Sequence, residues 1–198
     1  YHTCAILDNG DLKCWGWDQY GQLGNGPGSS SIITAPSSTA IDLGTGRTAV
    51  AVTTSVHFTC AILDDGSVAC WGDGSSYELG TGNANSKLIP TQTASLGLGR
   101  TAVEITAGAQ HACVILDDGS VACWGDNQFG QLGDGTTLSR HTPTQTATLG
   151  VGRTAISIDA GYFHTCAILD DGSVTCWGNN PDGRLGDGTS HERYTPTQ

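Results

Sequence analysis

The sequence has no methionine, only three phenylalanines and only eight basic residues in 198. It contains no apolar run near the ~18 residues that a membrane span requires, so we expect no membrane insertion. Its 19 acidic residues and net charge of −11 oppose the basic surface that a phosphate backbone needs, so we expect no nucleic-acid partner. The absence of methionine and of a recognisable signal peptide predicts a mature product or a segment of a longer protein.

Catalytic motifs are also missing. There is no Gly-x-Ser-x-Gly motif, and no repeat supplies Ser, His and Asp in the roles of a triad. The segment LGDGT, at 132–136 and 185–189, lacks the alternating oxygen ligands and the final Glu of a calcium hand, so it is interpreted as a turn. We therefore predict no enzyme activity, no cofactor and no metal site. An enzyme, such as a lyase or hydrolase with a site in a central channel, is a less favoured alternative.

One motif is present four times: CAILDNGDLKCWG at 4–16, CAILDDGSVACWG at 60–72, CVILDDGSVACWG at 113–125 and CAILDDGSVTCWG at 166–178. The first interval between leading cysteines is 56 residues and the next two are 53. A fixed period indicates one array whose units bury their faces on each other. We therefore predict a single repeat domain over 1–198, with repeats 1–56, 57–109, 110–162 and a truncated 163–198.

Each period predicts short strands and almost no helix, since the chain has 29 glycines and alternating apolar and polar segments. Four strands in about 50 residues are typical of a β-propeller blade. Each repeat also has a tryptophan beside its second cysteine, which we expect to fill the wedge between blades: Trp15, Trp71, Trp124 and Trp177. In the third repeat the expected strands are 102–106, 111–116, 121–125 and 143–149.

The cysteines of each repeat flank a turn. If Asp8-Asn9-Gly10 is a three-residue loop with Gly10 in the left-handed region, Cys4 lies opposite Cys14. Directly opposed residues of antiparallel strands are close enough for a disulfide after a modest adjustment. The same arithmetic applies to every repeat and predicts four stapled hairpins, Cys4–Cys14, Cys60–Cys70, Cys113–Cys123 and Cys166–Cys176. Such bonds persist in oxidising compartments, so we expect an extracellular or cell-surface protein.

Zinc is the competing interpretation of these cysteines. His2, His111 and His164 each precede a cysteine by two residues, but one repeat offers only three ligands and Phe58 occupies the equivalent position in the second repeat. A structural zinc site normally has four ligands. The histidines are interpreted instead as packed under a turn, and the three arginines Arg47, Arg100 and Arg153 as neutralising acids of a neighbouring blade.

The segment AGAQHACVILDDGSVACWGDNQFGQLGDGT at 107–136 resembles the repeat of the regulator of chromosome condensation family, and the likeness recurs in all four repeats. The resemblance implies a β-propeller, typically of seven four-stranded blades, that serves as a platform for protein partners. The nuclear exchange activity and chromatin docking of the family's founder are not expected here, because this chain is acidic and has paired cysteines. It looks more like the disulfide-bearing repeats of bacterial secreted or surface proteins.

Seventeen residues that follow the third repeat's Gln145, TATLGVGRTAISIDAGY, have no counterpart after Gln198 or before Tyr1. We therefore expect an incomplete or open propeller, either a fragment of a longer array or a subunit that completes its sheets with another copy. The second possibility gives an alternative function: a self-assembling, homo-oligomeric subunit of an extracellular polymer formed by strand exchange.

The favoured function is a non-catalytic extracellular scaffold that binds a protein, or a carbohydrate, through its loops. Positions that differ between near-identical repeats are free of the shared structural demand, and they cluster after each Trp-Gly and before each histidine position. Aromatic residues in these loops suit protein contacts or stacking on sugars. The candidate partner surface consists of Trp17, Tyr20, Tyr77, Phe129, Tyr162 and Phe163.

Overall fold

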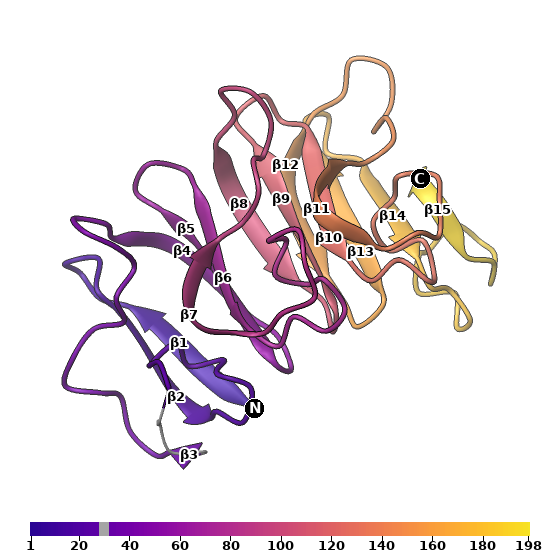
Figure 1. The fold of residues 1–198 in the computed structure, drawn as a ribbon. Coiled ribbons are helices and arrows are strands. Elements are labelled where there is room, and N and C mark those ends of the chain that lie inside the picture. The colour runs from indigo at the N-terminus through magenta and orange to yellow at the C-terminus, as the bar shows by residue number, and fades with distance from the viewer. Residues whose placement is uncertain (28–31) are drawn as a thin grey trace.

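The computed structural model describes residues 1–27 and 32–198, and within these ranges all regular secondary structure is β-strand. Three four-stranded sheets and one three-stranded sheet lie side by side in the order of the sequence (Figure 1). The predicted all-β architecture of four-stranded blades is therefore confirmed. Among the described residues, no helix long and apolar enough to cross a membrane is found.

The sheets are simple meanders in which each strand pairs antiparallel with the next one in sequence. The strands are β1 (His2–Ile6), β2 (Leu12–Trp17), β3 (Ile32–Ile33), β4 (Ala49–Thr54), β5 (Phe58–Leu63), β6 (Val68–Gly72), β7 (Lys87–Gln92), β8 (Ala102–Ala107), β9 (His111–Leu116), β10 (Val121–Gly125), β11 (Arg140–Gln145), β12 (Ala155–Ala160), β13 (His164–Leu169), β14 (Val174–Gly178) and β15 (Arg193–Thr197).

The sheets are offset by one strand from the repeats read in the sequence. Each full sheet takes its first strand, β4, β8 or β12, from the end of one repeat and its other three from the next repeat. The first sheet, β1-β2-β3, holds the counterparts of the second, third and fourth strands. Consecutive repeats therefore share a sheet, so strand pairing within each full sheet joins one repeat to the next.

The outer strand of each blade differs from our expectation. A strand was predicted over 143–149, whereas β11 runs over Arg140–Gln145 and the chain then turns away. The pairing of β10 with β11 shifts register between Cys123 and Gly125, which lets the outer strand start three residues earlier. Pro143, which has no amide hydrogen, is tolerated because β11 lies at the edge of its sheet.

The hairpins have the predicted register. Cys4 pairs with Cys14 and Ile6 with Leu12, while Leu7 donates its amide to the Asp11 carbonyl at 2.8 Å. Gly10 has φ +82°, as the turn requires. Disulfides join Cys4–Cys14, Cys60–Cys70, Cys113–Cys123 and Cys166–Cys176, each with 4.1 Å between Cα atoms. The stapled hairpin predicted for every repeat is thus confirmed.

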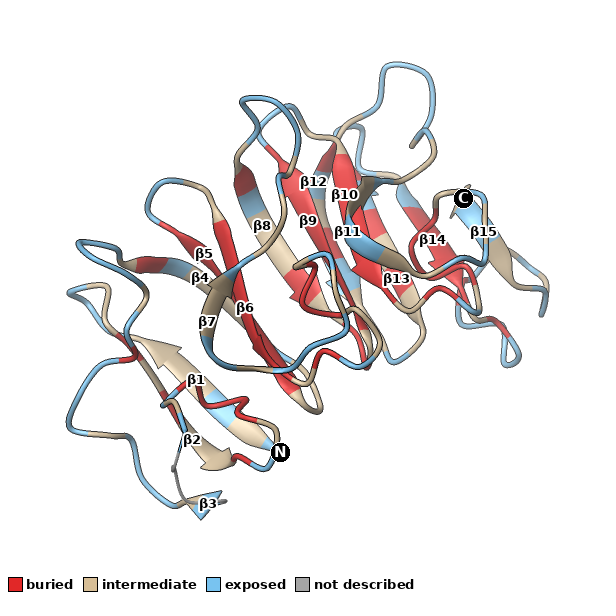
Figure 2. Ribbon diagram, viewed as in Figure 1, coloured by how far each residue is buried: buried red, intermediate tan, exposed pale blue. Residues whose placement is uncertain are grey.

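The core lies between the sheets. Buried residues form three clusters, and each cluster joins side chains from two consecutive sheets. Figure 2 shows the buried positions concentrated on the middle strands of the blades, while the connecting loops are largely exposed. Trp71, Trp124 and Trp177 are fully buried at these boundaries, as predicted for wedge-filling residues, whereas Trp15 in the first sheet is only half-buried.

Candidate functional site

The boundaries between sheets are fixed by a tryptophan that reaches the preceding sheet. The indole nitrogen of Trp71 donates to the Gln22 carbonyl at 2.9 Å, and that of Trp177 donates to the Gln131 carbonyl at 2.9 Å. The ring lies against a glycine of the earlier loop: a Cβ on Gly133 would approach Trp177 Nε1 to 2.8 Å. The tryptophans therefore position the loops that follow the third strand of each blade.

Histidines fix the turns that precede the second strand. His111 Nε2 lies 3.0 Å from Thr165 Oγ1 of the next sheet, and the Thr165 hydroxyl donates to the Gln131 carbonyl at 3.0 Å. His111 is fully buried and covers Gly108, where an added Cβ would meet the imidazole at 2.1 Å. This confines the turn Gly108–Gln110 between two sheets.

Together these two sets of segments form one end of the molecule, which we call the loop face. It comprises the turns 55–57, 108–110 and 161–163 before the second strands, and the loops 17–22, 73–78, 126–131 and 179–184 after the third strands. The structure brings a turn of one sheet against the loop of the preceding sheet. The variable positions singled out in the sequence are therefore neighbours across the sheet boundaries.

The first boundary of the loop face is aromatic. The rings of Trp17 and Tyr20 contact each other with centroids 5.5 Å apart, and both contact His57 of the second sheet at 5.4 and 4.7 Å. Tyr1 meets Trp17 edge-on at 5.8 Å. At the third boundary Phe129 contacts Phe163 at 5.1 Å, and Tyr162 packs on Phe163 at 4.6 Å.

The second boundary is polar instead. Gln110 donates to the Ser76 hydroxyl at 3.1 Å, in the positions that the other boundaries fill with rings. Tyr77 lies apart from these contacts and stacks on His141 of β11, with centroids 3.7 Å apart. Tyr77 has φ +66°, while the other repeats have glycine at this position. The replacement of glycine by tyrosine is visible in the sequence, but nothing in the sequence indicates His141 as the partner.

Burial divides the six predicted surface residues. Five are half-buried at the sheet boundaries, and Tyr162 alone among them is mostly exposed, at 58%. Trp17 contacts Tyr20 and Phe129 contacts Phe163, whereas Tyr77 is held by His141, so these rings are supported at three separate boundaries. The candidate surface is therefore Tyr162 together with the accessible edges of its neighbours.

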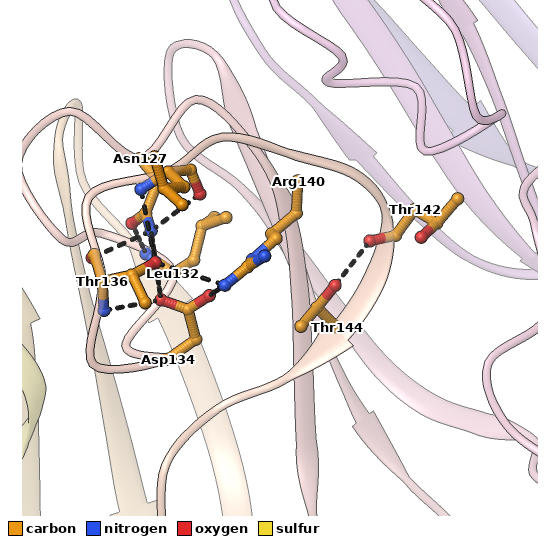
Figure 3. A network of polar contacts seen from close by, with 8 residues as sticks. Asn127, Leu132, Asp134, Thr136, Arg140, Thr142 and Thr144 are labelled. Atoms are coloured by element: carbon orange, nitrogen blue, oxygen red, sulfur yellow. Dashed lines mark hydrogen bonds and ion pairs between the residues drawn. The ribbon is translucent and has the colours of Figure 1, made fainter.

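In each LGDGT loop the aspartate binds an arginine of the following outer strand. Arg140 Nε donates to Asp134 Oδ2 at 2.6 Å, and Thr136 donates to Oδ1 of the same carboxylate (Figure 3). The Asn127 amide donates to the carbonyls of Thr136 and Leu138, which closes the loop. Although partial burial acts to raise it, the pKa of Asp134 is lowered on balance by the hydrogen bonds from Thr136 and Arg140.

The fourth repeat copies this loop with Asn180, Asp187, Thr189 and Arg193. The hydrogen bond from Arg193 is the main cause that lowers the pKa of Asp187 to about 2. Within residues 1–27 and 32–198, no group of three or more His, Cys, Asp or Glu side chains is placed to hold a metal ion. These loops act as turns that brace the outer strand.

The opposite end of the molecule carries arginine pairs. Arg100 binds Asp117 and Asp118 at 3.3 and 2.7 Å, and Arg47 and Arg153 make the same contacts in their repeats. The expectation of pairing with a neighbouring blade is wrong: each arginine binds the hairpin of the sheet that it leads into, because its linker passes beside that hairpin. Exposed pairs of this kind contribute little to stability, because solvent screens the charges.

Two kinds of buried titratable group lie at the sheet boundaries. Burial lowers the pKa of His111 to about 3 and that of His2 to about 4, so both imidazoles are neutral in the folded protein. Burial, opposed by backbone hydrogen bonds and reinforced by Asp73 and Asp126, raises the pKa of Glu78 to about 7. The threonine hydroxyls beside the two imidazoles, Thr165 and Thr59, donate to the carbonyls of Gln131 and Gln22, so these groups join neighbouring sheets.

Comparison with known proteins gives one consistent answer. The E3 ubiquitin-protein ligase HERC2 of Homo sapiens is 31% identical over 196 residues, which cover 99% of this chain and 4% of that protein. The Ultraviolet-B receptor UVR8 of Arabidopsis thaliana is 30% identical over 195 residues, which cover 98% of this chain and 43% of that protein. The chain therefore spans less than half the length of these curated relatives.

Solved structures show the same fold. Human WBSCR16 superposes with a TM-score of 0.85 at 26% identity, over 99% of this chain and 50% of that one. Yeast RCC1 (Prp20), in its structure bound to Kap60, superposes with a TM-score of 0.82 at 18% identity, over 99% of this chain and 46% of that one. The predicted β-propeller architecture is confirmed.

Family models agree with these structures. A model described as Regulator of chromosome condensation (RCC1) repeat matches residues 1–22, 49–78, 102–131 and 155–184. A second model with the same description matches residues 65–115 and 118–168. Since these matches recur in every repeat and cover more than half of the sequence, the chain belongs to the Regulator of chromosome condensation (RCC1) repeat family.

Proposed function

We propose that this chain is a non-catalytic binding scaffold that acts outside the cell or at its surface and holds a protein partner on the loop face. Four disulfides support an oxidising compartment, where such bonds persist. Yeast RCC1 (Prp20), which shares this fold, is bound to Kap60 in its crystal structure.

The observation that carries the proposal is the aromatic cluster of Phe129, Tyr162 and Phe163. Phe163 contacts both other rings, and Tyr162 presents 58% of its surface to solvent above this support. A ring that is already fixed loses little conformational freedom on binding, and tyrosines of this kind are frequent hot spots of protein interfaces. Tyr162 is therefore the central contact of the proposed surface.

A matched pair of variants tests this surface. Tyr162→Ser removes the exposed ring, and Ile156→Ser removes an equally exposed side chain, 59%, at the opposite end of the same sheet. Cross-linking of the wild-type chain in cell-surface and secreted fractions, followed by mass spectrometry, should yield a partner that Tyr162→Ser loses and Ile156→Ser retains. Equal recovery with all three proteins would contradict the proposal.

The proposed compartment has its own test. Protein isolated from its natural source without reductant should contain all four local disulfides and no free thiol, measured by alkylation and mass spectrometry. Free cysteines would overturn the extracellular assignment. A glycan array addresses the carbohydrate alternative: binding that is lost with Tyr162→Ser would show that the same ring stacks on a sugar rather than on a protein.

A second candidate function, self-assembly, rests on the faces of the first and fourth sheets. Thr3 is exposed and His164 half-buried, yet they occupy the two positions that Thr165 and His111 fill at an internal boundary. Likewise, a Cβ placed on Gly133 would meet Trp177 of the next sheet, whereas a Cβ placed on the equivalent Gly186 has no atom within 4 Å. We infer that these two faces can pair with each other, so that copies of residues 1–198 associate head to tail.

Light scattering tests self-assembly directly. The polypeptide 1–198 should form oligomers whose mass grows with concentration, and Thr3→Arg should reduce it to a monomer. Ile156→Ser, which lies outside both faces, should leave the mass unchanged. A wild-type chain that stays monomeric at every concentration would contradict this function and leave the scaffold proposal intact.

A further inference from the structure

Glu78 is a carboxylate buried at the boundary between the second and third sheets. Glu78 is only 2% exposed, and one of its carboxylate oxygens accepts a hydrogen bond from the Ser76 amide at 2.7 Å. The Glu78 carbonyl accepts the Trp124 indole at 2.8 Å, so the residue lies directly in the contact that joins the two sheets. The functional surface described above does not explain an acid at this place.

The corresponding positions carry side chains with N–H donors: Gln22, Gln131 and Arg184. In the third repeat the Gln131 amide donates to Asp126 Oδ2 at 2.8 Å, while its oxygen accepts the Phe129 amide at 3.0 Å. The second repeat keeps an acid, Asp73, in the place of Asp126 but has Glu78 in the place of Gln131. Glu78 reproduces the donor of Gln131 only when it is protonated.

The charged groups that act on Glu78 come from both sides of the boundary, and both are acids. Asp73 precedes it on the same loop, and Asp126 belongs to the loop of the third sheet. Burial and these two carboxylates disfavour the ionised form, against two backbone hydrogen bonds that favour it, and the pKa of Glu78 is about 7. The group therefore changes charge near neutral pH while it is enclosed between two sheets.

The surrounding loop lacks the asparagine that closes the equivalent loop of the third repeat. Gly74 occupies the position of Asn127, whose amide closes the equivalent loop of the third repeat with several hydrogen bonds. Tyr77 holds a left-handed backbone conformation that is costly for a side chain other than glycine. The Ser76 contact to Gln110 is a single hydrogen bond, where the adjacent boundaries have aromatic contacts. Ser86 forms hydrogen bonds with Asp73 and Gly74, and Tyr77 stacks on His141, so Glu78 is the side chain that holds this loop at the buried boundary itself.

We propose that Glu78 is a pH-sensitive latch between the second and third sheets, closed when its carboxyl group is protonated and loosened when it is ionised. The proton passes between the Glu78 carboxyl and solvent, and no other group needs to change. When protonated, the carboxyl donates a hydrogen bond toward Asp73 as Gln131 does to Asp126. When ionised, it adds a third negative charge to a buried site.

The sign of the effect follows from the two pKa values. An unfolded chain loses this proton near pH 4.5, whereas the folded chain holds it up to about pH 7. The stabilisation is therefore complete below pH 4.5 and is lost as the pH rises through 7. Between pH 6 and 8 these values correspond to an increase of about tenfold in the equilibrium constant for unfolding.

Glu78→Gln is the primary test, because it makes the donor permanent. The buried histidines contribute equally to both proteins, so the ratio of the unfolding constants of wild type and Glu78→Gln isolates the latch. Denaturant unfolding should show this ratio rising about tenfold from pH 6 to pH 8. Hydrogen exchange, corrected for intrinsic rates, should show faster opening of residues 73–78 in the wild type at pH 8 and no such change in Glu78→Gln. A constant ratio would overturn the proposal.

A transplant provides the second variant. Gln131→Glu places a carboxyl beside Asp126 at the third boundary, and it should give that boundary the same rise in unfolding between pH 6 and 8. Asp73→Asn removes a negative charge that raises the pKa of Glu78, so it should lower this pKa. The loss of stability should then be complete at a lower pH than in the wild type. If Asp73→Asn leaves the transition unchanged, the two acids are not coupled and the latch is refuted.

Discussion

His111 Nε2 and Thr165 Oγ1 lie 3.0 Å apart across the boundary between the third and fourth sheets, fully enclosed by protein. At the preceding boundary the same two positions hold Phe58 and Ala112, which pack in one apolar cluster. A polar side chain on one sheet thus faces a polar partner on the next, and an apolar side chain faces an apolar one. Burial explains this matching, since an unpaired polar group between sheets is costly.

This matching predicts coupled effects of mutation. Thr165→Ala should lower the free energy of unfolding by roughly 1–3 kcal/mol, because it leaves the buried His111 nitrogen without its partner. The double variant His111→Phe with Thr165→Ala restores the pair found at the second boundary and should recover part of that loss. Denaturant unfolding of both single variants and the double variant measures the coupling, and strictly additive losses would contradict it.

The buried histidines predict acid sensitivity. The pKa of His111 is lowered to about 3, so the folded protein excludes a proton that the unfolded chain binds below about pH 6.5. The stabilisation is therefore present above pH 6.5 and is lost as the pH falls toward 3. His111→Gln should reduce the fall in unfolding free energy between pH 6.5 and pH 3. His191→Gln, at an exposed position, should leave this fall as in the wild type.

Alanine variants of two glycines distinguish the cost of backbone strain from the cost of a disturbed contact across the sheet boundary. Gly133 has φ +68° and Gly186 has φ +73°, but only a Cβ on Gly133 would meet Trp177. Gly186→Ala should cost only the strain of the left-handed conformation, about 1–2 kcal/mol. Gly133→Ala should cost clearly more, because the indole must also move. Equal melting temperatures of the two variants would show that the tryptophan contact is not tight.

Tyr77 predicts an order of stability among its own variants. It combines φ +66° with a stacked contact to His141, 3.7 Å between ring centroids. Tyr77→Ala loses the contact and keeps the strain, whereas Tyr77→Gly loses the contact and relieves the strain. The glycine variant should therefore be more stable than the alanine variant by about 1–2 kcal/mol, measured by thermal or denaturant unfolding. The reverse order would mean that the left-handed conformation is abandoned.

Much of the fold follows from local sequence. The turn Asp8-Asn9-Gly10 sets the parity of its hairpin, and parity alone places Cys4 opposite Cys14. The motif recurs, so one hairpin predicts all four disulfides and the blade that contains them. The outer strand β11 was misplaced because its register depends on an irregularity beside Gly125, and alternation of apolar residues does not reveal such a shift.

The candidate site was predicted only in outline. Comparison of the repeats identified the loops that hold Phe129 and Phe163, but it gave no sign that these rings touch or that Tyr162 alone would stay largely exposed. It also left the burial of Glu78 unseen. The missing information is the packing of one sheet against the next.

The sequence by itself determined the repeat, the hairpin register and the pairing of the cysteines, because these depend on turns and on the two-residue period of a strand. Only the tertiary structure decided which residues meet across a boundary, such as His111 with Thr165 or Tyr77 with His141. Those partners are separated by more than one strand and by a change of sheet. Their contact is set by the twist and offset of neighbouring sheets, and no local rule of the chain specifies it.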